Sequence, residues 1–185
     1  MPSRARDAAT FDRVLADACR GDQAAVAVLF NDLQPRLLRF LRATEPRSAD
    51  DIASDVWVSI AQGLGSFRGG QAEFRAWAFT ITRRRLADHR RRGARRPVDL
   101  PGDQAFSDLP TVVTSDGAAI ANMSAQDAVA TIIGCLPTEQ AEVVLLRIVG
   151  DLDARQVGQV LGRSEGWVRI NQLRALQKLA ERFGA

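Results

Sequence analysis

The sequence has little of what a secreted, membrane-spanning or metal-binding protein needs. No apolar run approaches the ~20 residues of a transmembrane helix, and the first residues, MPSRARDAATFDR, lack the apolar segment of a signal peptide. The two cysteines, Cys19 and Cys135, lie far apart and belong to no C-x-x-C pair. We therefore expect buried free thiols, a reducing cytoplasmic location and no direct membrane insertion.

Catalytic and metal-binding signals are also sparse. His89 is the only histidine, and no cysteine or carboxylate lies at a spacing that would complete a zinc site with it. The glycine-rich segment 63–74 lacks the G-x-x-x-x-G-K-[ST] pattern of a phosphate-binding loop, and no strand precedes it. We expect no metal, no cofactor and no enzymatic activity.

Basic residues are absent from residues 97–146, and Lys178 is the only lysine among 25 basic residues. The arginines form two blocks, one of which ends at Arg96, and eight of the fourteen residues 83–96 are arginine. Guanidinium groups fit phosphates and base edges, so this block favours a nucleic-acid partner. A solvated charged surface is the alternative interpretation.

Apolar spacing predicts helices over most of residues 10–96. One helix should end at Gly21, and the next should run to about Ala43, kinked or divided at Pro35. The segment around 74–96 combines an apolar half with the arginine block. The apolar half has four residues on one face, which should anchor the helix in the core: Phe74, Trp77, Ala78 and Ile81.

Within the arginine block, Asp88 lies four residues after Arg84 and four before Arg92. This helical spacing suggests that Asp88 holds the two arginines in place.

The segment after Pro46 predicts a third helix with an acidic start. Ser48 and Asp51 have the S-x-x-D form of a capping box. Three aliphatic residues recur every fourth position and should face inward: Ile52, Val56 and Ile60. Asp51 and Asp55 share another face near Trp57, which indicates either capping and solubility or a contact patch with a polar rim.

Residues 97–123 contain three prolines and four aspartates without a sustained helical pattern. We interpret this segment as a flexible linker. The fold class is therefore all-α, with two small helical domains over residues 10–96 and 124–183.

The second domain predicts a helix-turn-helix. A helix from Thr138 has the apolar residues Val143, Val144, Leu146 and Ile148. Asp153 and Gln156 can cap a short helix that ends at Gly162, and a longer helix follows from about Glu165. Its expected buried residues are Val168, Leu173 or alternatively Gln172, Leu176 and Leu179. The polar first half of that helix is typical of major-groove recognition, whereas an ordinary helical hairpin does not need one.

Three segments together resemble the extracytoplasmic-function (ECF) group of sigma-70-type RNA polymerase sigma factors. They are SADDIASDVWVSI, FRAWAFTITRRRLADHRRR and LPTEQAEVVLLRIVGDLDARQVGQVLGRSEGWVRINQLRAL. The family pattern has an acid pair, an aliphatic residue, an acid and an aromatic in the first segment, then F-x-x-W and D-H-x-R-R in the second. All three segments follow the family order.

The resemblance implies a promoter-specificity subunit that works with core RNA polymerase. Its acidic helix would bind the clamp helices of the largest subunit through Asp50, Asp51, Asp55 and Trp57. The −10 promoter element would be bound and melted by Phe67, Arg68, Arg83, Arg84, Asp88, Arg91 and Arg92. The −35 element would be read by Arg163, Ser164, Glu165, Trp167, Arg169, Asn171, Gln172 and Arg174.

Further partners implied by the resemblance are the polymerase flap, promoter DNA and an anti-sigma factor. Three single residues and one run depart from the family pattern. The run is INQL (residues 170–173), which stands where the family has a more basic S-R-x-H-type run. Arg84 stands where asparagine is frequent, Ser54 where glutamine is frequent, and Trp167 where a small residue is common. The base preference of better-known members therefore does not transfer to this chain.

Two other functions remain to be separated from this one. An independent transcription regulator would use the helix-turn-helix alone and would have no use for the patch at Asp51 and Asp55. An RNA-binding or RNA-processing enzyme would use the arginine helix but would need a catalytic constellation, which the sequence does not offer.

Overall fold

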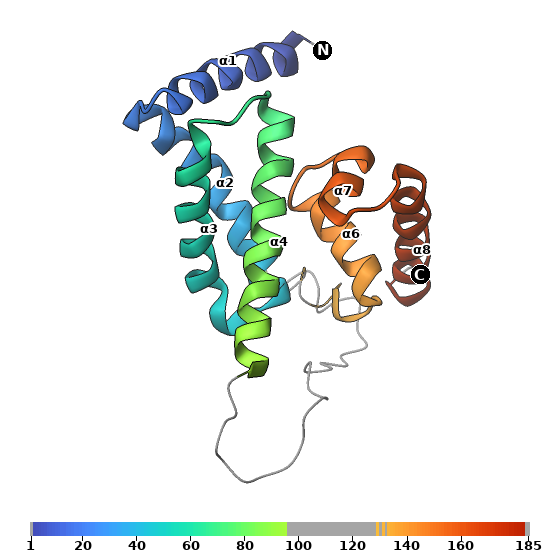
Figure 1. Ribbon diagram of the computed structural model, residues 1–185. Helices are drawn as coiled ribbons and strands as arrows, with labels where there is room; N and C mark the ends of the chain where they lie inside the picture. Colours follow the sequence, from blue (N-terminus) through green and yellow to red (C-terminus); the bar gives the residue numbers. More distant parts are fainter. Residues whose placement is uncertain (1, 96–128, 130, 132, 184–185) are drawn as a thin grey trace.

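The chain is described here by a computed structural model of residues 2–95, 129, 131 and 133–183, in which every regular element is helical (Figure 1). The helices are α1 (Pro2–Cys19), α2 (Gln23–Thr44), the 3₁₀ turn η1 (Pro46–Ser48), α3 (Ala49–Leu64), α4 (Gln71–Arg95), α6 (Thr138–Ile148), α7 (Ala154–Leu161) and α8 (Glu165–Phe183). This confirms the all-α class with an N-terminal and a C-terminal helical unit. The expected linker, 97–123, lies outside the described residues.

The turn between α1 and α2 forms where the sequence predicted a helix end. Gly21 has a φ of 93°, a backbone conformation that glycine adopts without steric cost. The Asp22 side chain then caps α2 by accepting hydrogen bonds from the backbone N–H groups of Ala24 and Ala25, at 2.8 and 3.2 Å. Pro35 does not divide α2, which continues to Thr44.

The start of α3 differs from the expected capping box. Ser48 precedes the helix, but its side chain makes no capping hydrogen bond. Its φ and ψ of −125° and 14° reflect the preceding turn η1 and lie outside the extended region that an N-cap serine needs. Inward packing is confirmed, since Ile52, Val56 and Ile60 are almost fully buried.

Helix α4 contributes two of the large aromatic side chains of the N-terminal core, Phe74 and Phe79. Phe74, Ala78 and Phe79 are completely buried, and Phe79 meets Phe40 of α2 edge-on at 5.5 Å between ring centroids. Trp77 and Ile81, which were expected in the core, are only partly buried. The buried stripe is therefore rotated toward Phe79, because that side of α4 is covered both by α2 and by the C-terminal unit.

Helices α6, α7 and α8 form the C-terminal unit. The Asp153–Gln156 capping box is confirmed, with both hydrogen bonds at 2.8 Å, and Gly162 ends α7 with a φ of 65°. Three other expectations were wrong, because Ile148, Leu173 and Leu176 are 68%, 57% and 49% exposed. Helix α8 instead packs through residues at spacings of three and four: Val168, Asn171 and Ala175.

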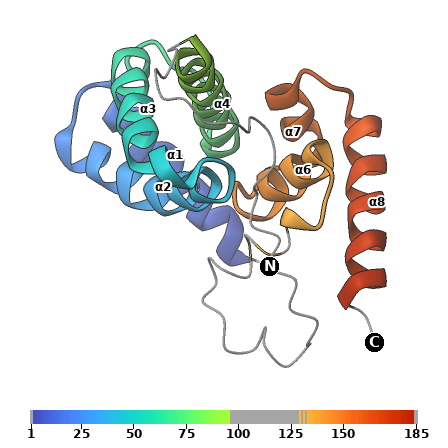
Figure 2. The same cartoon turned by 90° about the horizontal axis from the view of Figure 1, so that it is seen from below.

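The two units are in contact, and one core cluster runs through both of them, while a second, smaller cluster lies between α6 and α8. Helix α7 packs along α4, while α8 lies on the far side of the C-terminal unit, with α6 and α7 between it and α4 (Figures 1 and 2). Within the described part of the chain, no helix is both long and apolar enough to cross a membrane.

Candidate nucleic-acid and partner interfaces

The acidic face of α3 is exposed to solvent. Asp50, Asp51, Ser54 and Asp55 all lie on this face, and the Asp50 and Asp55 side chains are 75% and 53% exposed. Two arginines approach it: Arg42 at 3.4 Å from Asp50 and Arg92 at 3.5 Å from Asp55. Exposed pairs of this kind contribute less than about 1 kcal/mol. A basic partner can therefore displace them at little cost.

Trp57 lies beside this face and is partly buried. Its indole Nε1 donates a hydrogen bond to Gln34 Oε1 at 2.6 Å, and its ring packs against Phe30 at 4.8 Å between centroids. Phe30 and Val58 are 41% and 57% exposed. The structure thus places an apolar ledge next to the acids, a combination typical of protein–protein contacts.

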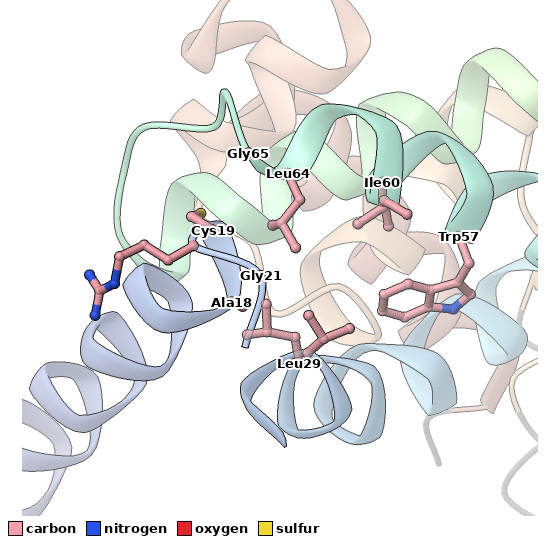
Figure 3. Close-up of a pocket in the computed structure, with 11 residues that line it drawn as sticks. Ala18, Cys19, Gly21, Leu29, Trp57, Ile60, Leu64 and Gly65 are labelled. Carbon is pink, nitrogen blue, oxygen red and sulfur yellow. The ribbon is translucent and has the colours of Figure 1, made fainter. Parts of the chain in front are cut away.

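A pocket of about 390 Å³ continues from this ledge toward the α1–α2 turn (Figure 3). Trp57, Ile60 and Leu64 of α3 line one side, and Leu29 and Cys19 lie across from them. Arg20 is the only charged residue in the lining. The pocket fits an apolar side chain better than a polar substrate.

The arginines of α4 do not form one uniform surface. Arg84, Arg90, Arg91 and Arg92 are exposed. Arg90 is tied to the end of α2, donating to Glu45 Oε2 at 3.1 Å and to the Thr44 carbonyl at 2.8 Å. The exposed basic surface of α4 therefore begins at Arg84.

Asp88 does not hold Arg84 and Arg92, as its helical spacing had suggested. It pairs with Arg91 instead, and Arg92 reaches Asp55 of α3. Arg92 pairs with an aspartate of a neighbouring helix rather than with one on its own helix. Helical spacing within α4 could not predict this contact, because it gives no information on which residues of α3 lie nearby. Asp88 still orients one arginine of the basic surface.

Arg83 is placed differently from the other arginines of the expected −10 surface. Its guanidinium makes a two-pronged pair with Glu142 of α6, with N–O distances of 2.5 and 3.3 Å, and donates to the Val160 carbonyl of α7 at 3.0 Å. Its side chain is 35% exposed. In this structure Arg83 binds the C-terminal unit.

Aromatic side chains gather where the α3–α4 loop meets α4. The Phe67 ring lies 5.1 Å from Trp77 and 5.7 Å from Phe74, in the latter case edge-on. Trp77 in turn lies against Gly63, where a Cβ atom would come within 2.7 Å of the indole. Phe74 is completely buried and belongs to the core, whereas Phe67 and Trp77 lie at its rim, with Arg68 exposed beside them.

The helix-turn-helix is held together by a close approach of α7 to the turn. A Cβ atom on Gly158 would lie 2.6 Å from the Arg163 carbonyl oxygen, so only glycine fits there. The same two residues are joined by a hydrogen bond from Arg163 N to the Gly158 carbonyl at 2.8 Å. This contact fixes the direction in which α8 leaves the turn.

Not all of the expected −35 residues lie on the exposed face of α8. Asn171 is 7% exposed and donates to the Trp167 carbonyl at 3.0 Å, so its amide faces inward. Gln172 accepts a hydrogen bond from Arg147 Nε at 3.0 Å, and Ser164 Oγ accepts from Trp167 N at 3.2 Å as a helix cap. These three positions have structural partners in the protein.

The remaining expected residues are not all on the outer face of α8, since Arg163 lies in the turn before the helix and Glu165 and Trp167 are partly buried. Arg169, which pairs with Glu165 one turn earlier, and Arg174 are exposed. The Arg163 guanidinium lies 5.2 Å above the Trp167 ring and 3.4 Å from Glu139. The exposed apolar residues Ile170 and Leu173 lie among them. The sequence analysis did not include Ile170 among the DNA-facing residues and placed Leu173 in the core. Helical periodicity favoured the leucines as the buried residues, whereas in the structure Ala175 packs against the core.

His89 is partly buried on α4. Among the described residues, no group of three or more histidine, cysteine or acidic side chains is arranged to hold a metal ion.

Comparison with known proteins gives two family matches in the chain. The model of sigma-70 region 2 matches residues 29–96, which include α3 and α4, and that of sigma-70 region 4 matches residues 126–179, which include α6 and α7. The ECF RNA polymerase sigma factor SigD of Mycobacterium tuberculosis is 29% identical over 194 residues, covering 100% of this chain and 89% of SigD.

Two further relatives cover most of the chain. The ECF RNA polymerase sigma factor ShbA of Streptomyces griseus is 29% identical over 179 residues, covering 88% of this chain and 89% of ShbA. The solved structure of CnrH in complex with the cytosolic domain of CnrY is similar with a TM-score of 0.61 at 27% identity, covering 92% of this chain and 96% of that one. The similarity therefore extends over both helical units.

Proposed function

The chain belongs to the ECF group of the sigma-70 family, and from this membership we propose that it is a promoter-specificity subunit of bacterial RNA polymerase without catalytic activity of its own. The observation that carries the proposal is the presence, in one chain, of an exposed acidic face, an arginine-rich helix and a helix-turn-helix in the family order. Cytoplasmic location follows from the proposed role.

The acidic face of α3 is the proposed contact with the clamp helices of the largest polymerase subunit. Asp50, Asp51 and Asp55 project from one exposed side, and Trp57 with Phe30 supplies adjacent apolar surface. Basic side chains on a partner would replace Arg42 and Arg92 at the carboxylates. An independent regulator would not need this surface.

The second half of α4 is the proposed contact with the −10 region. Arg84, Arg91 and Arg92 are exposed and can neutralise phosphates. Each neutralised phosphate adds about 0.9 to the slope of log affinity against log salt. Arg68 is exposed in the α3–α4 loop beside Phe67, before the first residue of α4, and is a separate proposed contact with the −10 region.

Melting requires that an unpaired base be held outside the stack. Phe67 and Trp77 are partly exposed rings at the edge of the α3–α4 loop. A base stacked on such a ring gains about 1–3 kcal/mol, which is comparable with the cost of unstacking it. We assign base capture to this rim and exclude Phe74, which is completely buried.

The outer face of α8 is the proposed reader of the −35 region. Arg169 and Arg174 can donate to guanine O6 and N7 or to phosphates, and Ile170 and Leu173 can contact thymine methyl groups. Asn171 is left out of this face because it is buried.

An anti-sigma factor and the polymerase flap are further proposed partners. The solved relative CnrH forms a complex with the cytosolic domain of CnrY. Exposed apolar residues such as Phe30 on α2 and Val58 on α3 give this chain surfaces on which a helical partner can pack.

Run-off transcription tests the proposed function. Purified core polymerase is incubated with a pool of genomic fragments, alone, with this chain, or with a chain carrying Asp51→Lys and Asp55→Lys. We expect promoter-dependent transcripts only with the unmodified chain. If the chain binds duplex DNA but gives no transcripts with core polymerase, it is an independent regulator and the proposal fails.

A further inference from the structure

The contact between the two units covers a residue of the proposed DNA surface. Arg83 is held by both carboxylate oxygens of Glu142 and by the Val160 carbonyl. These partners come from α6 and α7, and of these two helices α7 packs along α4 (Figures 1 and 2). A carboxylate and a phosphate use the same guanidinium donors in the same two-pronged manner. Glu142 and a DNA phosphate therefore compete for Arg83.

A second ion-pair group joins the units about two turns earlier on α4. Arg75 is 9% exposed and donates to Asp151 of the α6–α7 loop at 2.9 Å and to both carboxylate oxygens of Asp32 in α2 at 3.2 Å. Arg36 of α2 also donates to the Val149 carbonyl at 3.4 Å. The C-terminal unit thus contributes acceptors to arginines of both α2 and α4.

Apolar packing supports these polar contacts. Phe79 of α4 is completely buried, and a Cβ atom on Gly150 of the α6–α7 loop would lie 3.1 Å from its ring. The core cluster runs from Phe79 and Leu86 of α4 to Val157 and Val160 of α7 without a break. The units therefore form a packed interface with charged residues along it.

We propose that this contact is a self-occluded state, in which the surface made by Glu142, Asp151 and the Val160 carbonyl covers Arg83 until DNA or a protein partner opens the chain. The proposal rests on the proposed function, since it takes α4 as the −10 surface. Full contact of the −10 surface with DNA then requires the units to separate, because Arg83 must be released, whereas Arg84, Arg91 and Arg92 are exposed already.

The occlusion is one-sided. Helix α8 lies on the outer side of the C-terminal unit, away from α4, and Arg169 and Arg174 remain exposed. The −35 surface is therefore available in the closed state while Arg83 is not. The apparent affinity of the complete −10 surface, the one that includes Arg83, falls by the fraction of open molecules, so for this surface a chain that is one-tenth open binds about tenfold more weakly.

The test weakens the contact without touching the proposed DNA residues. Glu142→Gln with Asp151→Asn removes both carboxylates and keeps their shape, and asparagine tolerates the φ of 53° at Asp151. The matched control, Asp17→Asn with Glu181→Gln, removes the same charge away from the interface, from the half-exposed Asp17 that pairs with Arg20 and from the exposed Glu181. Small-angle X-ray scattering of the full chain reports its radius of gyration, and fluorescence anisotropy with mixed-sequence duplex DNA reports affinity at low salt.

We expect the interface variant to have a larger radius of gyration and an affinity about fivefold higher, the effect of losing a partly buried ion pair. The control should match the unmodified chain in both measurements. An unchanged radius of gyration would overturn the closed contact, and a larger radius without tighter DNA binding would overturn the occlusion. Failure of the run-off assay with a larger radius of gyration would instead refute the proposed function and leave the closed contact standing.

Discussion

The close approach of α7 to the turn of the helix-turn-helix leads to a prediction about protein stability. Replacing glycine by alanine should lower the free energy of unfolding at Gly158 and raise it at Gly166. Gly158→Ala places a Cβ atom 2.6 Å from the Arg163 carbonyl oxygen and 3.5 Å from Glu165 N. Real Cβ atoms do not come this close to a backbone oxygen, so the turn must move by several tenths of an ångström. Gly166→Ala, in the first turn of α8, meets no atom within 4 Å.

The magnitudes follow from two terms. Replacing glycine by alanine inside a helix stabilises it by about 1 kcal/mol, and this is the whole effect expected at Gly166. Overpacking of a close backbone contact costs about 1–3 kcal/mol. It also weakens the 2.8 Å hydrogen bond from Arg163 N to the Gly158 carbonyl, which contributes about 1 kcal/mol. We expect Gly158→Ala to lower the free energy of unfolding by about 1–3 kcal/mol.

Urea unfolding followed by tryptophan fluorescence and circular dichroism measures both variants. The Gly158→Ala turn should also displace α8 and weaken binding to duplex DNA carrying the −35 region, whereas Gly166→Ala should bind at least as well as the unmodified chain. Equal stability of the two variants would refute the inferred contact between α7 and the turn.

Three further outcomes are expected. Asp51→Lys with Asp55→Lys should abolish co-purification with core polymerase through like-charge repulsion while leaving duplex DNA binding intact; retained co-purification contradicts the assignment of this face. Arg84→Ala should reduce the salt slope of DNA binding by about 0.9, and an unchanged slope places Arg84 off the phosphates. Asn171→Ala should lower the free energy of unfolding by about 1–3 kcal/mol in urea melts, because it removes a buried amide bonded to a helix carbonyl; a loss of base specificity without loss of stability would return Asn171 to the recognition face.

Local patterns in the sequence were sufficient for much of the fold. The capping pair Asp153 and Gln156, the helix end at Gly162 and the inward stripe through Val56 depend on residues within a few positions, so periodicity and capping rules identified them. Ser48 shows the limit of such rules. Its S-x-x-D pattern was present, but the preceding 3₁₀ turn set a backbone conformation that does not permit the cap.

The orientation of α8 could not be predicted from hydrophobicity. Leu173 and Leu176 are more apolar than Asn171 and Ala175, yet the latter two face the core. Alanine allows close packing against α6, and the Asn171 amide is satisfied by the Trp167 carbonyl within its own helix. The outer face consequently gains the exposed leucines, which changes the proposed −35 surface from purely polar to mixed.

Contacts between residues distant in sequence were also beyond local patterns, and Arg83 shows why they matter. It is the first residue of the arginine block and directly precedes Arg84, so sequence position alone does not separate the two. The structure separates them, because Arg83 turns toward Glu142, 59 residues away, while Arg84 remains exposed. Arg83 lies where α4 changes from a core helix to a basic surface, so its guanidinium has a carboxylate partner in the closed chain and a phosphate partner in the proposed open one. When the Glu142 carboxylate is exchanged for a DNA phosphate, the chain opens. The degree of opening should therefore depend on the salt concentration and on the DNA concentration, since salt ions and DNA both act on the charge of Arg83.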